Sequence, residues 1–250
     1  MPSVTQRIKQ VKQPWGGYIS IKSFNVYDLN DNKQLHVAEN IHSSLVGMAV
    51  DYMTRFLIGS TVEDAFKISL IGANLIDEIE NAKKLLSKIT GLDDTSIINA
   101  CKLVGYDVCY RAGKNFYRPV ENIQPDAVTI ENIRIMLNRS MLWVDQYGPI
   151  VLNGFDFEGA YTDKICIGDA DYLTHNTLWD MKVSKNKPDK NNTLQLLVYY
   201  LMGMHSIYNE FQCIKQLGIF NPRLNCVYLL KISDISSDVI EQVLTDVIGY

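Results

Sequence analysis

One stretch of the chain decides how the rest is interpreted. Residues 168–183 read Gly-Asp-Ala-Asp-Tyr-Leu-Thr-His-Asn-Thr-Leu-Trp-Asp-Met-Lys-Val. The apolar residues on either side of 174–177 predict two short strands joined by a polar turn. Successive side chains on a strand point to opposite faces, so the pattern also predicts which residues meet across the hairpin.

This hairpin carries charged side chains on an otherwise apolar ladder. If Leu173 and Leu178 close the turn, antiparallel pairing puts Asp171 directly opposite Asp180, and Lys182 shares a face with Asp180. Like charges directly across a ladder are destabilising, and buried carboxylates are costly unless they are paired or bound to a metal. A divalent cation between the two carboxylates, with the lysine beside it, resolves the conflict. The hairpin therefore predicts a metal site.

Composition places the chain among ordinary globular proteins. Its 250 residues are 47% hydrophobic and 21% charged, enough for one large domain or a core with a subdomain. No apolar run approaches the roughly 20 residues of a membrane span, and the first residues lack the apolar stretch of a secretory signal. We expect a cytoplasmic protein with no membrane partner.

The five cysteines argue against a disulfide framework, because their number is odd and their spacing wide. There is no Cys-x-x-Cys zinc pattern. We expect buried, reduced side chains at Cys101, Cys109, Cys166, Cys213 and Cys226.

Charge is unevenly distributed along the chain. The net charge of -4 excludes a generally basic nucleic-acid binder. However, the segment before Asp28 carries four basic residues and no acid. A second basic group follows the hairpin, where the segment with Lys185, Lys187 and Lys190 contains one acidic residue, Asp189. Such groups are able to meet a polyanion locally, although a solvated lysine loop explains Lys185 and Lys187 equally well.

The order of predicted elements indicates an α/β fold with a mixed central sheet. A strand is predicted over 17–28, with a short return strand after the turn at 30–33, and helical periodicity dominates 41–118. The second half then alternates as α-β-β-β-α-β-α, with elements near 128–147, 150–157, 164–173, 178–183, 193–208, 225–231 and 237–248. We therefore predict a region of N-terminal strands and helices over 1–125, forming a cleft wall, and a core domain over 126–250.

Three motifs in this order resemble a known family. They are Gly168-x-x-Asp171, Asp180-x-Lys182 and, on the next helix, Gln195-Leu196-x-x-Tyr199. Together they resemble the PD-(D/E)XK nuclease superfamily, which has the restriction-endonuclease-like fold, and within it the branch of RecB-type and CRISPR-associated exonucleases. The resemblance covers about 126–235 and matches the αβββαβ core order of that superfamily.

The resemblance implies a Mg²⁺- or Mn²⁺-dependent nuclease acting on nucleic acid, DNA rather than RNA, through a metal-activated water. Asp171 and Asp180 would bind the metal, helped by the backbone carbonyl of Met181, and Lys182 would position or activate the water. Gln195 and Tyr199 would line the site, since residues four apart share a helix face. The lysines that follow the second strand would contact the substrate, namely Lys185, Lys187 and Lys190.

A third metal ligand is less clearly marked. Family members carry an upstream Gly-x-x-x-His motif, and here Gly47 is followed by Asp51 in place of the histidine. An oxygen ligand also suits Mg²⁺ or Mn²⁺, so Asp51 is one candidate and Glu131 a competing one; Glu39 and His42 are weaker. Some relatives bind an iron–sulfur cluster, but two C-terminal cysteines are too few, so none is expected.

Two alternatives stay open. One is a nucleic-acid-binding or assembly protein on the same fold without catalysis, and the other is an interaction protein unrelated to nucleic acid. Retention of Asp171, Asp180 and Lys182 together favours the enzyme, because a scaffold has no reason to keep destabilising charges. The sequence leaves open exo- or endonuclease action, strandedness, polarity, oligomeric state, protein partners and pathway.

Overall fold

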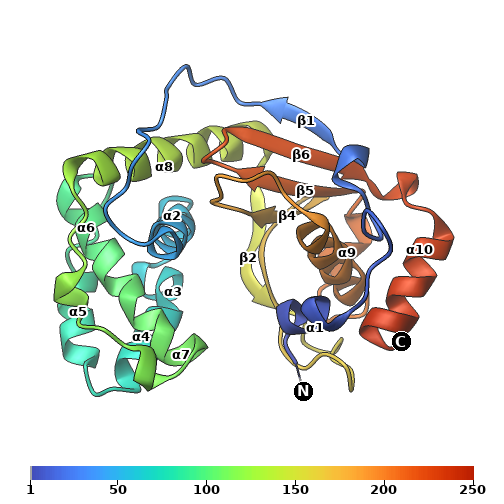
Figure 1. Cartoon of the computed structure of the whole chain (residues 1–250), viewed down its shortest axis with the longest axis horizontal. Coiled ribbons are helices and arrows are strands. Elements are labelled where there is room, and N and C mark those ends of the chain that lie inside the picture. Colours follow the sequence, from blue (N-terminus) through green and yellow to red (C-terminus); the bar gives the residue numbers. More distant parts are fainter. Residues whose placement is uncertain (1) are drawn as a thin grey trace. The chain divides into compact units, whose positions relative to one another are not determined.

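The charged hairpin belongs to a six-stranded mixed sheet with the strand order β1-β6-β5-β4-β3-β2 (Figure 1). The structure is a computed structural model that describes residues 2–250. Only β4 and β5 pair in parallel, and all other neighbours are antiparallel. The strands are β1 (Asn25–Asp28), β2 (Ile150–Asp156), β3 (Asp169–Thr174), β4 (Thr177–Met181), β5 (Gln216–Asn221) and β6 (Cys226–Lys231). The predicted α/β class with a mixed sheet is confirmed.

The chain divides into two compact units. One combines the chain up to Leu29 with Trp143–Tyr250 and contains the whole sheet, and the other is Asn30–Leu142. The sequence analysis placed the boundary between residues 125 and 126, but the units divide between Leu142 and Trp143, within helix α8 (Ala127–Tyr147), and again after Leu29. The N-terminal residues join the sheet unit because β1 pairs with β6 and helix α1 (Val4–Gln10) packs against helix α9 (Lys190–Met204).

Helix α9 covers one face of the sheet. Its leucines are fully buried among apolar side chains of β3, β4 and β5, including Leu173, Leu178 and Leu217. Fully burying a leucine stabilises a fold by about 1.5–3 kcal/mol, so this face holds much of the core of the unit. The closing segment, α10 (Ser237–Gln242) followed by a π-helical turn, η7 (Val243–Ile248), adds Val243 and Val247 to the same cluster.

Aromatic rings cover the opposite face. The ring of Trp143, at the end of α8, stacks on Phe220 with centroids 4.9 Å apart and meets Trp179 edge-on at 5.2 Å. Tyr147 reaches the same indole from one turn further along the helix. Because side chains alternate along β4, Trp179 on this face directs its neighbour Asp180 to the α9 face.

One core strand was missed by the sequence analysis. The strand after α9 is β5 (Gln216–Asn221), parallel to β4, whereas the predicted strand at 225–231 is its antiparallel partner β6. A glycine is unusual inside a strand, so Gly218 hides β5 in the sequence pattern. The structure requires glycine at this position, because a Cβ there would overlap the ring of Trp179. The order after α8 is therefore βββαββα.

The N-terminal strand is shorter than predicted. Only Asn25–Asp28 pair as a strand, after a 3₁₀ turn over Ile21–Ser23, and no return strand forms in residues 29–42. That connection is held instead by polar side chains of α8. Arg139 forms a buried ion pair with Asp31 at 2.6 Å, and Asn132 accepts the backbone N–H of His36. Long-range side-chain contacts of this kind leave no periodic signal in a sequence.

The remaining unit is helical. Thr61 and Asp93 cap their helices, each accepting a backbone N–H three residues on. The helices are α2 (Ser43–Leu57), α3 (Val62–Ala65), α4 (Lys67–Asn74), α5 (Ile79–Leu86), α6 (Asp94–Leu103) and α7 (Asp107–Arg111). Among the described residues, no helix is both long and apolar enough to cross a membrane.

Candidate functional site

The site forms where β4 separates from β3. The hairpin pairs Leu173 with Leu178 and Tyr172 with Trp179, which is the predicted register. Pairing between these strands is recorded no further, although β3 stays paired with β2 and β4 with β5 along its full length. The two strands therefore part at the next position, which is occupied by Asp171 on β3 and Asp180 on β4.

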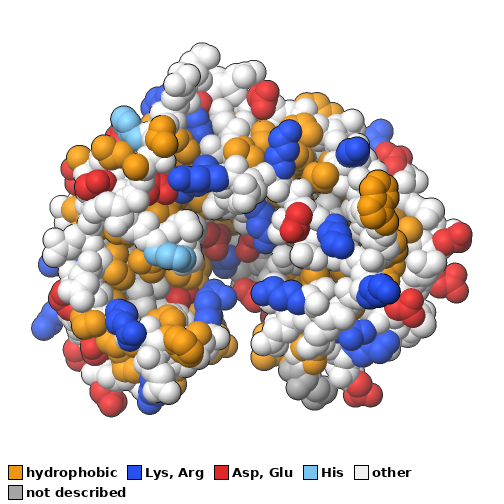
Figure 2. Space-filling model, viewed as in Figure 1, with side chains coloured by type: hydrophobic (Ala, Val, Ile, Leu, Met, Phe, Trp, Pro, Cys, Tyr) orange, Lys and Arg blue, Asp and Glu red, His pale blue; other side chains and the backbone are white. Residues whose placement is uncertain are grey.

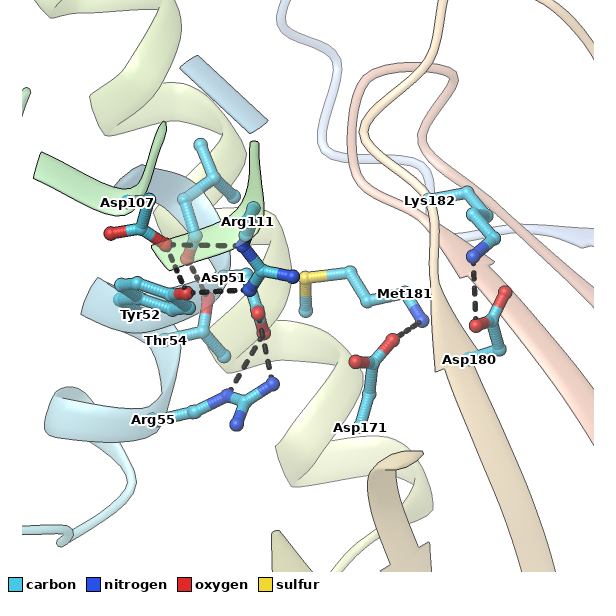
Figure 3. Close-up of polar contacts among 11 residues, drawn as sticks. Asp51, Tyr52, Thr54, Arg55, Asp107, Arg111, Asp171, Asp180, Met181 and Lys182 are labelled. Carbon is cyan, nitrogen blue, oxygen red and sulfur yellow. Dashed lines mark hydrogen bonds and ion pairs between the residues drawn. The ribbon is translucent and has the colours of Figure 1, made fainter. Parts of the chain in front are cut away.

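The side chain of Asp171 links the two strands at this position. Its Oδ2 accepts a hydrogen bond of 2.7 Å from the backbone N–H of Met181 (Figure 3). This bond satisfies one backbone donor and fixes the carboxylate between the strands. Asp171 is therefore oriented by the strand that carries Asp180.

Asp180 and Lys182 are two residues apart, so their side chains lie on the same side of the sheet and contact each other. Asp180 is 1% exposed, and its Oδ1 accepts a 2.9 Å hydrogen bond from Nζ of Lys182, whose side chain is about a quarter exposed. Figure 3 shows the ammonium group reaching back along the strand to this carboxylate. A carboxylate and a lysine so deeply placed partly neutralise each other, which lowers the cost of keeping either in the core.

Helix α9 supplies the polar side chains above this pair. Oε1 of Gln195 accepts a hydrogen bond of 3.3 Å from Lys182, and Nε2 of Gln195 donates one of 2.7 Å to the hydroxyl of Tyr199. The two α9 residues are one turn apart and face β4 together. The structure thus joins Asp180, Lys182, Gln195 and Tyr199 in one hydrogen-bonded chain.

Burial and nearby carboxylates raise the pKa of Tyr199. Burial raises the pKa of its hydroxyl well above 10, and the negative charges of Asp180, Asp169 and Asp171 raise it further. The hydroxyl therefore stays protonated at neutral pH. It also follows that three carboxylates act on one buried phenol, so negative charge is concentrated beneath α9.

Asp169 is the first residue of β3. In the sheet it lies opposite Asp156 of β2, a like-charged pair that the sequence analysis did not anticipate. Both residues are exposed, so water screens the repulsion between them. The sequence placed Asp156 on a predicted strand, but only the register of β2 and β3 shows that Asp169 lies opposite it.

The donor chemistry of the hairpin fits a hard cation. Asp171 and Asp180 offer carboxylate oxygens, and Met181 between them offers a backbone carbonyl. Mg²⁺ is commonly held by one or two carboxylates with the remaining positions filled by water. No group of three or more His, Cys, Asp or Glu side chains suited to a metal occurs among residues 2–250.

Asp51 lies in the helical unit, on α2. Its carboxylate forms a bidentate pair with Arg55 one turn later, at 3.2 and 2.9 Å, as drawn in Figure 3. The guanidinium lies 5.7 Å from the ring centre of Tyr52. Asp51 thus has a structural partner within its own helix.

The other upstream candidates also have partners within the helical unit. Glu131 pairs with Arg134 on α8, and Glu39 accepts a hydrogen bond from Asn132. His42 caps α2 by accepting the N–H of Ser44. The structure therefore gives each of these residues a local role.

A buried carboxylate in the helical unit escaped the sequence analysis. Asp107 is fully buried on α7, and its carboxylate accepts a hydrogen bond from Tyr52 at 2.6 Å with Arg111 beside it (Figure 3). Its other oxygen accepts one from Ser69 at 2.5 Å. Burial raises the pKa of Asp107, partly offset by these hydrogen bonds. The network ties α2, α4 and α7 together, and no local motif predicted it.

The lysines predicted to bind substrate are exposed. Lys185 and Lys187 lie in the loop between β4 and α9, and Lys190 is the first residue of α9. This loop leaves β4 directly after Lys182. The basic group is therefore anchored at both ends by elements that carry the site.

A comparison of the chain with protein-family models, curated proteins and solved structures finds no match.

Proposed function

We propose that this protein is a metal-dependent nuclease that hydrolyses phosphodiester bonds of nucleic acid, DNA rather than RNA. One observation carries the proposal: Asp171 and Asp180 occupy opposite positions of the hairpin where the pairing of β3 and β4 ends, with Lys182, Gln195 and Tyr199 hydrogen-bonded in a chain from Asp180. A sheet that needed only stability would place apolar side chains at these positions, since replacing buried charges with apolar residues is often neutral or stabilising.

The metal would be Mg²⁺ or Mn²⁺, held by Asp171 and Asp180 with the carbonyl of Met181. A bound divalent cation supplies charge neutralisation at the phosphoryl group and lowers the pKa of water. Both carboxylates have defined orientations in the protein, Asp171 through Met181 and Asp180 through Lys182.

Lys182 is the group of this chain best placed to act on the reacting phosphate. Its ammonium donates to Asp180 and to Gln195, which leaves it directed at the region between the carboxylates and α9. There it would orient the attacking water and balance the negative charge that develops on the phosphoryl oxygens. Gln195, held by Tyr199, is a positioning residue that keeps the ammonium in this direction.

Substrate binding would depend on local rather than overall charge. The net charge is -4, so the nucleic-acid backbone is expected to meet Lys185, Lys187 and Lys190 beside the site. Neutralising phosphates releases counterions, so affinity should fall steeply as salt rises.

A cleavage assay tests the proposal. Single-stranded DNA, duplex DNA and RNA are incubated with wild type, Lys182→Ala and Lys215→Ala, with Mg²⁺, Mn²⁺ or EDTA. Lys215 is an exposed lysine outside the site and is the matched control. We expect metal-dependent cleavage by wild type and Lys215→Ala and a loss of about 100-fold or more in Lys182→Ala.

Two results would contradict the proposal. Cleavage that persists unchanged in Lys182→Ala would place the activity elsewhere. Metal-independent binding of nucleic acid without cleavage of any substrate would favour the non-catalytic binding protein.

A further inference from the structure

Trp15 is the most exposed large hydrophobic residue of the described chain. It is 102% exposed, whereas the other two tryptophans, Trp143 and Trp179, are buried. A tryptophan in water leaves a large apolar surface without contacts, so its position needs a physical explanation.

The loop that carries Trp15 is fastened to α9 on both sides. Nε2 of Gln13 donates to Asn191 at 2.8 Å, and the hydroxyl of Thr193 donates to the carbonyl of Ile19 at 2.7 Å. Between these bonds, a Cβ on Gly17 would lie 2.8 Å from Cβ of Lys190, so the backbone passes directly over the first turn of the helix. The indole is therefore held outward by an anchored loop.

Two glycines give the loop its path. Gly16 and Gly17 both have positive φ angles, 84° and 89°, which other residues adopt only with strain. The turn is closed by the N–H of Gly17, which donates to the carbonyl of Pro14 at 3.0 Å. This backbone directs Trp15 away from the apolar core.

The surroundings of Trp15 are basic. The first 27 residues contain no Asp or Glu, and Lys12, Lys22 and Lys190 are exposed. The nearest acid in α9, Asp189, uses its carboxylate to cap the helix by accepting from Asn191 and Asn192. Figure 2 shows Lys and Arg side chains, with Asp and Glu side chains among them, over the part of the molecule that Figure 1 assigns to the N-terminal segment and α9.

The same helix connects Trp15 to the candidate site. Lys190 and Gln195 are five residues apart, which corresponds to about 7.5 Å along α9, and Gln195 is bonded to Lys182. All of these residues belong to the sheet unit. A strand of nucleic acid bound at Trp15 would therefore lie against the first turn of α9, the helix that also carries Gln195.

We propose that Trp15 stacks on an unpaired base of a single-stranded nucleic-acid segment, whose phosphates are met by Lys12 and Lys190. The inference rests on the proposed function and extends it to the form of substrate. A single indole among lysines suits stacking on a base, because aromatic side chains in basic grooves bind bases in this way. A stable protein interface would instead need a contiguous patch burying roughly 1,000 Å² or more.

The test measures binding by isothermal titration calorimetry in EDTA, so that no cleavage occurs. The proteins are wild type, Trp15→Ala, Trp15→Phe and Tyr27→Ala, a half-exposed aromatic residue on β1 that serves as the matched control. The probes are a single-stranded oligonucleotide, its duplex, and an abasic strand of equal length and charge.

We expect Trp15→Ala to raise the Kd for the single strand about tenfold, with Trp15→Phe and Tyr27→Ala near wild type. The difference between wild type and Trp15→Ala should vanish on the abasic strand, which retains the phosphates but offers no ring.

Equal Kd values for wild type and Trp15→Ala on the single strand would overturn the inference. So would an equal loss on the abasic strand, or a change in the oligomeric state of Trp15→Ala, which would indicate a protein interface. The outcome is separable from catalysis. Lys182-dependent cleavage with no effect of Trp15→Ala on binding would contradict only the stacking proposal. Stacking without cleavage would contradict only the proposal that the protein is a nuclease.

Discussion

Asp171 and Met181 lie on neighbouring strands of one hairpin, and the bond recorded between them joins a side chain to a backbone: the N–H of Met181 donates to Oδ2 of Asp171 at 2.7 Å. The carboxylate thus takes the donor at the point where pairing between β3 and β4 stops. Asp171 therefore ends the ladder between β3 and β4 at the position opposite Asp180.

Asp171→Asn should separate metal binding from folding. The amide oxygen can still accept from Met181, while the like charge opposite Asp180 is removed. We expect thermal stability in EDTA to equal or exceed that of wild type. The stabilisation by Mg²⁺, about 2.7 kcal/mol at a hundredfold excess over Kd, should disappear.

Thermal unfolding with and without Mg²⁺ measures this difference. Asp163→Asn is the control, because it removes one negative charge at an exposed position of the same unit. An equal Mg²⁺ response in wild type and Asp171→Asn would show that the metal binds elsewhere.

Tyr199→Phe should affect both activity and the pH dependence of stability. The change removes the hydroxyl that accepts from Gln195, so we expect about a tenfold loss in kcat with little change in KM. Because the pKa of Tyr199 is raised in the folded protein, its contribution to stability is complete below pH 10 and is lost as the pH rises beyond it.

Denaturant unfolding at pH 8 and above pH 10 tests the second part. The stability of wild type should fall more steeply over this range than that of Tyr199→Phe. Parallel curves would mean that the hydroxyl has an ordinary pKa and that the carboxylates do not act on it.

Asp31→Asn should weaken the helical unit. The Asp31 and Arg139 side chains are 8% and 4% exposed, and losing the charged partner of Arg139 should cost about 1–3 kcal/mol at pH 7. Burial alone would raise the pKa of Asp31, but the hydrogen bonds and charge of Arg139 hold it below its usual value. The stabilisation is therefore present above about pH 4 and is lost as the pH falls through the lowered pKa.

Chemical denaturation at pH 7 and at pH 3 checks this prediction. The two proteins should differ clearly at pH 7 and converge in acid. A difference that is the same at both pH values would assign the effect to packing.

Gly218→Ala should disturb the site from the far side of the sheet. The new methyl group would overlap Trp179, whose neighbour in β4 is Asp180. Overpacking of this kind costs about 1–3 kcal/mol. We expect reduced cleavage at temperatures where the variant is still folded, and partial recovery when Trp179→Phe is added.

Gly203→Ala is the matched control for this experiment. A methyl group there would overlap Phe211 in the core beneath α9, without touching β4. It should lower the melting temperature in a similar way while leaving the cleavage of folded protein near wild type. Equal loss of activity in both variants would show that general destabilisation explains the effect.

Sequence patterns predicted the hairpin register, the α9 motif and the fold class, because each depends on local alternation or helical spacing. They failed at β5, where Gly218 interrupts the strand pattern to make room for Trp179. They also failed at Asp31 and Asp107, whose partners Arg139, Tyr52 and Ser69 lie far away in the chain. Contacts of that range depend on the folded backbone and carry no periodic signal.

The aromatic face of the sheet gives this protein a built-in optical probe. Of the three tryptophans, Trp143 and Trp179 are buried against each other, and Trp179 precedes Asp180 directly. Indole emission depends on the surroundings of the ring, so removing Trp15 would leave a signal from this buried pair alone. The fluorescence of Trp179 would then report changes at the neighbouring Asp180, such as metal binding, without any added label.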